Sequence, residues 1–183
     1  MGEIVRSEIF RRAQEEASLQ LVDRLPSIPH VNASSALGVE LGGAFQRGRG
    51  GPGGWWILDA PTIRFPSPEP LRSEEILVPD LAGWRRERLS HLPQMAHITI
   101  APDWACEVLS PNTEECDREQ KMPVYAREGV RWVWLLDPDA RVLEIYSLTE
   151  GRGWRISAIY RDNALVRAEP FDAIELDLAV LWT

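Results

Sequence analysis

Lysine and cysteine are the residue types that this sequence has least of, and both shortages narrow the possible functions. Only two cysteines occur in 183 residues, Cys106 and Cys116, and neither lies in a C-x-x-C pair or near a histidine at zinc-ligand spacing. This excludes a disulfide framework and a zinc finger, and it predicts a reducing, cytoplasmic location. Lys121 is the single lysine among 20 basic residues, so arginine supplies almost all of the positive charge.

Long apolar runs are also missing. No stretch approaches the ~18–20 apolar residues of a membrane span, and residues 1–18 have neither the apolar core nor the cleavage site of a signal peptide. We therefore expect no membrane association. The net charge of −8 argues against indiscriminate nucleic-acid binding, although it leaves room for a local basic surface. The length and the 44% apolar content are typical of one globular domain.

The chain begins with helical patterns. Apolar residues recur at helical spacing in 3–25, and a second helix is expected over 31–46 in spite of its glycines. The glycine-rich run 47–54 predicts a loop. We expect residues 1–29 to form an N-terminal helical segment and residues 30–183 to form the main domain.

Strands dominate the remainder. Residues 55–65 and 76–84 predict two strands joined by a Pro- and Glu-rich turn, 85–101 an irregular excursion, and 103–110 a buried strand. Asn112, with Glu115 three residues later, resembles a capping box, and the helix that follows should end near Gly129. Further strands are expected at 131–137, 141–148 and 154–161, and the apolar tail 171–182 should dock back. This order predicts an α/β (α+β) fold with a mixed central sheet flanked by helices.

Two acidic residues lie in unusually apolar surroundings. Glu107 interrupts a core strand, where a carboxylate is costly unless it is paired or binds a metal ion. Asp80 follows Pro79 at the end of an apolar run, and a proline there predicts a bulge or an edge that re-aims side chains. The alternatives are a strand end at which Glu107 meets solvent or an arginine, and a plain Pro-Asp turn.

Lys121 is distinctive because the chain otherwise uses arginine. Asp117, Lys121 and Tyr125 lie four residues apart on one face of the predicted helix. An Asp117–Lys121 surface pair is the simplest interpretation, but an arginine would serve such a pair equally well. A site that needs a compact ammonium group would not accept a planar guanidinium. Lys121 is therefore a candidate for chemistry.

Taken together, Pro79-Asp80, Glu107-Val108 and a nearby lysine resemble the PD-(D/E)XK nuclease superfamily. Leu109 occupies the usual lysine position, and Lys121 fits the branches in which the lysine has moved to the following helix. The longer segments ILVPDLAGWRRER and PDWACEVLSPNTEECDREQKMPVYAREGVRWVWLLDP resemble the Uma-two-type restriction endonuclease family. This resemblance covers about residues 30 to 182 and implies a restriction-endonuclease-like fold.

The resemblance also implies a mechanism, a cofactor and a partner. Asp80 and Glu107 would bind Mg²⁺, or Mn²⁺, together with the backbone carbonyl of Val108, and Lys121 would orient or deprotonate the attacking water. The substrate would be DNA, and a homodimer is expected by analogy with nucleases that cut two strands. Tyr125 is expected to pack or to form a hydrogen bond beside the site, and the substrate-binding residues stay unassigned.

The N-terminal region departs from the family pattern, although His30 matches a histidine commonly found ahead of the helix. Because of this departure, Glu40 is a further candidate for an acidic ligand. Arg47, Arg49 and the arginines at 85, 86 and 88 could contact phosphates or could simply be solvated surface. Two other functions are left open: an inactive binding module that keeps the nuclease fold, and a metal-dependent hydrolase of another phosphoester.

Overall fold

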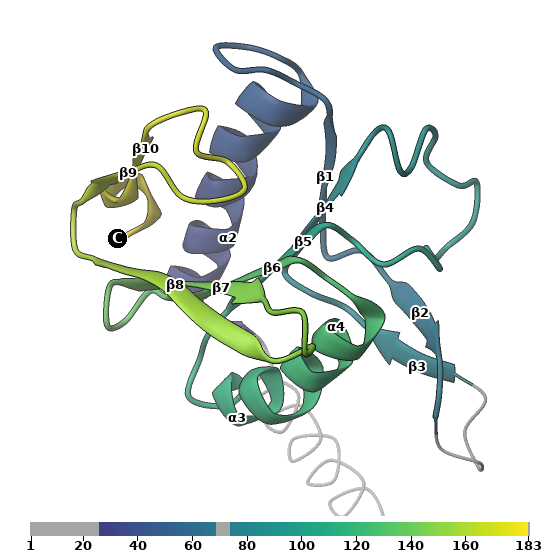
Figure 1. Cartoon of the computed structure of the whole chain (residues 1–183). Helices are drawn as coiled ribbons and strands as arrows, with labels where there is room; N and C mark the ends of the chain where they lie inside the picture. Colours follow the sequence, from purple (N-terminus) through teal and green to yellow (C-terminus); the bar gives the residue numbers. More distant parts are fainter. Residues whose placement is uncertain (1–25, 69–73, 183) are drawn as a thin grey trace, which may run out of the picture.

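A six-stranded mixed sheet forms the centre of the protein (Figure 1), as described by a computed structural model over residues 26–68 and 74–182. The strand order is β1-β4-β5-β6-β7-β8, in which β5 and β6 are parallel and all other neighbours are antiparallel. The predicted mixed sheet is therefore confirmed. Its strands are β1 (Trp55–Asp59), β4 (Leu81–Arg85), β5 (Trp104–Val108), β6 (Trp132–Asp137), β7 (Val142–Leu148) and β8 (Trp154–Arg161).

One long helix covers the first face of the sheet. Helix α2 (Ile28–Leu41) continues into the π-helical turn η1 (Gly42–Gln46), which confirms the helix predicted over 31–46. It begins earlier than predicted, because Pro29 fits the first turn and the Ser27 hydroxyl accepts a hydrogen bond from the His30 N–H. His30 therefore lies inside the helix rather than ahead of it. The predicted helix over 3–25 lies outside the described residues.

The two strands predicted at 55–65 and 76–84 are each divided in two. Ala60 adopts a left-handed φ of 44° before Pro61, which ends β1, and the chain breaks again at Pro79. The outer pieces, β2 (Ile63–Pro66) and β3 (Glu74–Leu77), pair with each other in a separate two-stranded sheet. The predictions of continuous strands are thus wrong, and the second break releases Asp80 from the ladder.

A three-part helical segment covers the second face. It consists of α3 (Glu114–Cys116), the π-helical turn η2 (Asp117–Lys121) and α4 (Met122–Glu128). The predicted capping box is wrong, because the helix begins at Glu114 and Thr113 occupies the N-cap without a side-chain cap. The predicted end is confirmed by Gly129, whose φ of 80° is left-handed.

The two faces of the sheet have separate apolar cores. Buried residues of α2 pack on one core together with Trp104, Cys106 and Val108, whereas Ala105 and Leu109 belong to the other core under α4. The tail joins the first core through β9 (Leu165–Val166), β10 (Leu176–Asp177) and the 3₁₀ turn η3 (Leu178–Leu181), as predicted. Within the described ranges, no helix is both long and apolar enough to cross a bilayer.

Candidate active site

Glu107 is a fully buried carboxylate in the middle of the second core. Its exposed fraction is 0%, and it lies on β5 between Cys106 and Val108, which point to the opposite face. Because side chains alternate along a strand, Glu107 faces the helical segment 114–128. A carboxylate in such a position is costly unless other groups compensate its charge.

Three side chains of the helical segment contact or support this carboxylate. Lys121 Nζ lies 2.8 Å from Glu107 Oε2 and 2.8 Å from Asp117 Oδ1. The Tyr125 hydroxyl donates a hydrogen bond of 2.6 Å to Glu107 Oε1. The spacing 117, 121, 125 therefore does place one face of the segment on the site.

The π-helical turn η2 is part of this arrangement. Its wider winding lets the Met122 N–H bond to the Asp117 carbonyl, immediately before Pro123, which cannot donate. The turn carries Asp117, which is 2% exposed, and Lys121 to the buried acid.

Asp80 approaches the same strand end from the neighbouring strand. Leu81 pairs with Cys106, so Asp80 lies just beyond the ladder, level with Glu107. Its Oδ2 accepts a hydrogen bond of 2.7 Å from the Val108 N–H. Its Oδ1 lies 2.9 Å from His30 Nε2 on α2. The structure therefore brings Asp80, Glu107, Val108 and Lys121 together, although they are far apart in the chain.

The charge of Glu107 is incompletely compensated. Burial raises its pKa to about 8, and the attraction of Lys121 offsets burial only in part, while Asp117 works in the opposite direction. Burial lowers the pKa of Lys121, but the attraction of Glu107 and hydrogen bonds to both acids outweigh burial, so its pKa lies above the usual range. Burial and then Glu107 raise the pKa of Tyr125. Lys121 is thus a cation and Tyr125 a neutral donor.

This donor set fits a hard divalent cation. Glu107 and Asp80 are oxygen ligands, and Asp80 is 26% exposed, which gives the site access to solvent. A cation would supply the positive charge that Glu107 lacks. In residues 26–68 and 74–182 no group of three or more His, Cys, Asp or Glu side chains forms a metal cage. Mg²⁺ needs only one or two carboxylates, because it keeps several of its waters. Glu40 is exposed on α2, and no contact joins it to Asp80 or Glu107 within the described residues.

The arginines after Asp80 have structural contacts. They lie at the far end of β4 from Asp80, because Arg85 is the last residue of that strand. Arg86 donates to the backbone carbonyls of Trp55 and Gln46, and Arg88 forms an ion pair of 2.9 Å with Asp103. The guanidinium of Arg85 stacks over Trp55 at 4.9 Å. The side chains of Arg85, Arg86 and Arg88 thus stabilise the edge of the sheet at β1 and β4. Arg47 and Arg49, in contrast, are exposed.

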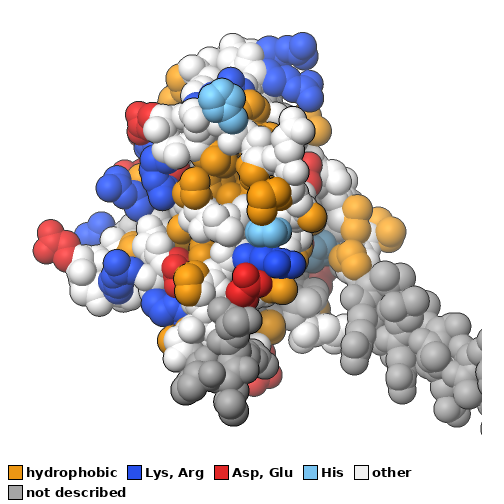
Figure 2. Space-filling view, turned by 90° about the vertical axis from the view of Figure 1, so that its right-hand side faces the viewer, with side chains coloured by type: hydrophobic (Ala, Val, Ile, Leu, Met, Phe, Trp, Pro, Cys, Tyr) orange, Lys and Arg blue, Asp and Glu red, His pale blue; other side chains and the backbone are white. Residues whose placement is uncertain are grey.

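The face that carries the excursion between β4 and β5 does not present a continuous basic stripe. Figure 2 shows apolar side chains gathered at its centre, with lysine or arginine side chains scattered around them. Exposed apolar residues of this excursion are Leu92, Met95 and Ile100.

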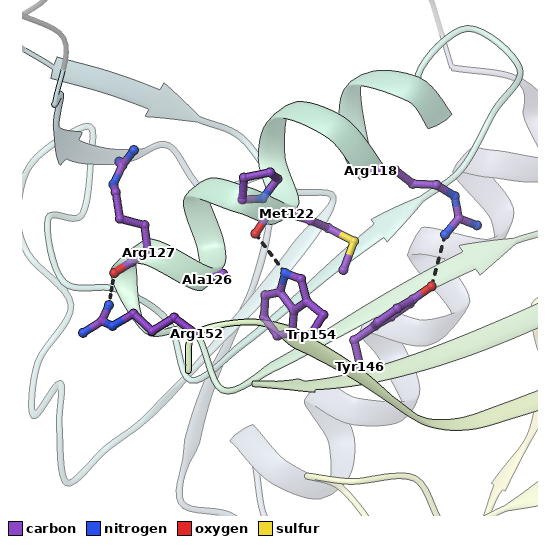
Figure 3. Close-up of a pocket in the computed structure, with 8 residues that line it drawn as sticks. Arg118, Met122, Ala126, Arg127, Tyr146, Arg152 and Trp154 are labelled. Carbon is purple, nitrogen blue, oxygen red and sulfur yellow. Dashed lines mark hydrogen bonds between the residues drawn. The ribbon is translucent and has the colours of Figure 1, made fainter. Parts of the chain in front are cut away.

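A pocket of about 620 Å³ lies between the outer side of the same helical segment and strands β7 and β8 (Figure 3). Met122 and Trp154 contribute to its apolar floor, and the Trp154 indole N–H donates to the Met122 carbonyl. Arginines stand around the rim: Arg118 pairs with Glu144 and Arg127 with Glu75. The rim charges are therefore largely neutralised, and this pocket is separate from the acidic site.

The contact between His30 and Asp80 was not predicted. Fifty residues separate them, and no spacing rule joins a helix residue to a strand end at that distance. The resemblance of His30 to a common family histidine is the one signal in the sequence that singled it out. The supporting contacts of Asp117 and Tyr125 follow from helical spacing.

Comparisons with known proteins identify the family from a family model and the fold from a solved structure. The model of the Uma2 family, described as "Putative restriction endonuclease", matches residues 9–180. A solved structure described as a putative nuclease belonging to DUF820 from Anabaena variabilis ATCC 29413 superposes with a TM-score of 0.64 at 19% identity. The match covers 86% of this chain and 82% of that one. The comparison with curated proteins gave no match.

Proposed function

The chain belongs to the Uma2 family of restriction-endonuclease relatives, and we propose that it is an endonuclease that hydrolyses DNA phosphodiester bonds with a divalent metal ion. One observation carries the proposal. Lys121 pairs with Glu107 at the carboxyl end of β5, and Asp80 accepts a hydrogen bond from the N–H of the next residue, Val108, although the three residues are far apart in the sequence. The fold alone would not argue for phosphodiester cleavage, but this set of groups does.

The metal ion would be held by Asp80, Glu107 and the Val108 carbonyl. When bound, Mg²⁺ or Mn²⁺ would polarise the phosphate and activate water. Lys121 is expected to orient that water and to offset the negative charge that develops on the phosphate. Its raised pKa favours this cationic role over proton abstraction. Tyr125 and Asp117 hold Glu107 and Lys121 in place.

The complete set of groups disfavours an inactive binding module. A fully buried glutamate that is paired with the single lysine of the sequence is more typical of a catalytic site than of a binding surface. The same groups could act on any accessible phosphodiester. An enzyme for another phosphoester can therefore be distinguished from a DNA endonuclease only by comparing substrates.

The test is a nicking assay with supercoiled plasmid. The wild-type protein should nick the plasmid with Mg²⁺ or Mn²⁺ and not with EDTA. Asp80→Asn should lower the rate by ~100-fold or more. Asp139→Asn, which changes an exposed acid in the β6–β7 turn, should retain activity. Parallel reactions with RNA and a small phosphodiester identify the substrate. Nicking in EDTA, or an active Asp80→Asn variant, would contradict the proposal.

A further inference from the structure

We propose that His30 is a positioning residue that holds the Asp80 carboxylate in the orientation needed for metal binding, an inference that rests on the proposed function. His30 Nε2 lies 2.9 Å from Asp80 Oδ1. The two groups come from α2 and from the break before β4. This contact joins the helix on the first face of the sheet to the acidic site at the carboxyl end of β5.

Asp80 needs a second anchor because of where it lies. It follows Pro79 outside the ladder, and 26% of its side chain is exposed. The Val108 N–H fixes only Oδ2, at 2.7 Å. A carboxylate with one hydrogen bond can still rotate about that bond, whereas contacts at both oxygens define its plane. Hydrogen bonds to metal-ligating carboxylates have this orienting effect in metal sites generally.

His30 is itself firmly placed, and among residues 26–68 and 74–182 its ring has no partner that competes with Asp80. It is 8% exposed in the first turn of α2, where its N–H bonds to the Ser27 hydroxyl at 3.3 Å. Its other ring nitrogen, Nδ1, is buried. Within the described part of the chain this nitrogen neither accepts nor donates a hydrogen bond. Burial of an imidazole is costly without a partner, so an apolar residue would serve better if packing were the only role. Asp80 is the group that compensates this cost.

The geometry favours a donor rather than a metal ligand. In a neutral imidazole that donates from Nε2, the free lone pair is on Nδ1, which is buried away from solvent. Nε2 cannot donate to Asp80 and ligate an ion at the same time. Furthermore, His30, Asp80 and Glu107 do not form a three-ligand cluster among the described residues. His30 therefore acts through Asp80.

The experiment measures Mn²⁺ affinity by electron paramagnetic resonance in the full-length protein at constant pH. His30→Gln places its amide nitrogen near the position of Nε2, whereas His30→Asn reproduces only the position of Nδ1. We expect His30→Gln to bind Mn²⁺ within about threefold of wild type. His30→Asn and His30→Ala should bind roughly 10- to 100-fold more weakly. Melting temperatures, measured without metal, separate loss of binding from loss of folding, and the Gln/Asn pair preserves the test if His30→Ala does not fold.

Each outcome has a distinct meaning. If the wild type binds no Mn²⁺, the proposed function fails and this inference fails with it. If the wild type binds and the Asn and Gln variants bind equally well, only the role of His30 is overturned. Electron spin-echo spectroscopy of bound Mn²⁺ should show no directly coordinated imidazole nitrogen, and such a coupling would show His30 to be a ligand instead.

Discussion

The two faces of the helical segment 114–128 both carry ion pairs, yet they differ in what those pairs do. On the inner face Lys121 contacts Glu107, which is fully buried. On the outer face Arg118 contacts Glu144, whose side chain is 21% exposed. Burial raises the pKa of Glu107 to about 8, and its lysine does not restore it. Burial also acts to raise the pKa of Glu144, but hydrogen bonds from Arg118 and Tyr146 outweigh it and the pKa is lowered.

This difference separates a site from a structural contact. The charges of the outer pair are compensated by neighbouring residues. Two of the arginines that line the pocket beside it (Figure 3), Arg118 and Arg127, are paired with glutamates. On the inner face, by contrast, the negative charge of Glu107 is only partly compensated by Lys121. A carboxylate that the fold buries without full compensation is a candidate for metal binding or catalysis, whereas one that gains from its partners contributes stability.

The largest expected effect comes from Glu107→Gln. This variant should lose plasmid nicking by ~1000-fold or more, because one of the proposed metal ligands is removed. The metal-free protein should nevertheless melt higher than wild type at pH 8, by about 5 °C, because the buried charge is gone. The folded-state pKa of about 8 lies above the ordinary value of 4.5, so ionisation of Glu107 costs stability as pH rises between these values.

The control for this prediction is the pH dependence. The difference in melting temperature should shrink as the pH falls and approach zero well below the ordinary pKa of 4.5, where the wild-type Glu107 is protonated in both states. A Glu107→Gln variant that melts lower than wild type at pH 8 would show that the inner pair stabilises the fold, as the outer pair does.

Lys121→Arg tests whether the inner face needs an ammonium group. The guanidinium keeps the charge but is larger and planar, so it cannot take the place of Nζ between Glu107 and Asp117. We expect a loss of ~100-fold or more in nicking rate. Arg118→Lys is the matched exchange on the outer face and should leave the rate unchanged. Equal tolerance of both exchanges would remove the distinction between the faces.

The smallest effect is expected for Arg118→Gln on the outer face. The variant should lose about 0.5–1 kcal/mol of stability at neutral pH, a value typical of partly exposed ion pairs, with no change in Mn²⁺ affinity. The pKa of Glu144 is lowered in the folded state, so its contribution is present above its ordinary pKa and is lost as pH falls through the lowered one. Denaturant unfolding of both proteins at neutral and acidic pH measures this convergence. Equal loss at both pH values would assign the effect to packing.

Sequence reasoning succeeded where the signal was local. Strands β6, β7 and β8 follow from apolar runs and short turns, and Gly129 ends its helix as expected. Sequence reasoning failed where tertiary contacts decide the strand boundaries. The runs 55–65 and 76–84 each look like one strand in the sequence. Ala60 and Pro79 divide them and send β2 and β3 into a second sheet. The capping box at Asn112 and Glu115 was wrong because the helix starts one residue after Thr113.

The sequence by itself determined the class of fold, the family and the three groups singled out for chemistry, since a lone lysine, a proline before Asp80 and an acid inside an apolar run are local features. Tertiary structure alone decided that these groups share one site, that Glu107 is left short of positive charge, and that His30 reaches Asp80. The physical reason is that burial and contact depend on strand pairing and helix packing, and these join residues whose separation along the chain carries no periodic signal.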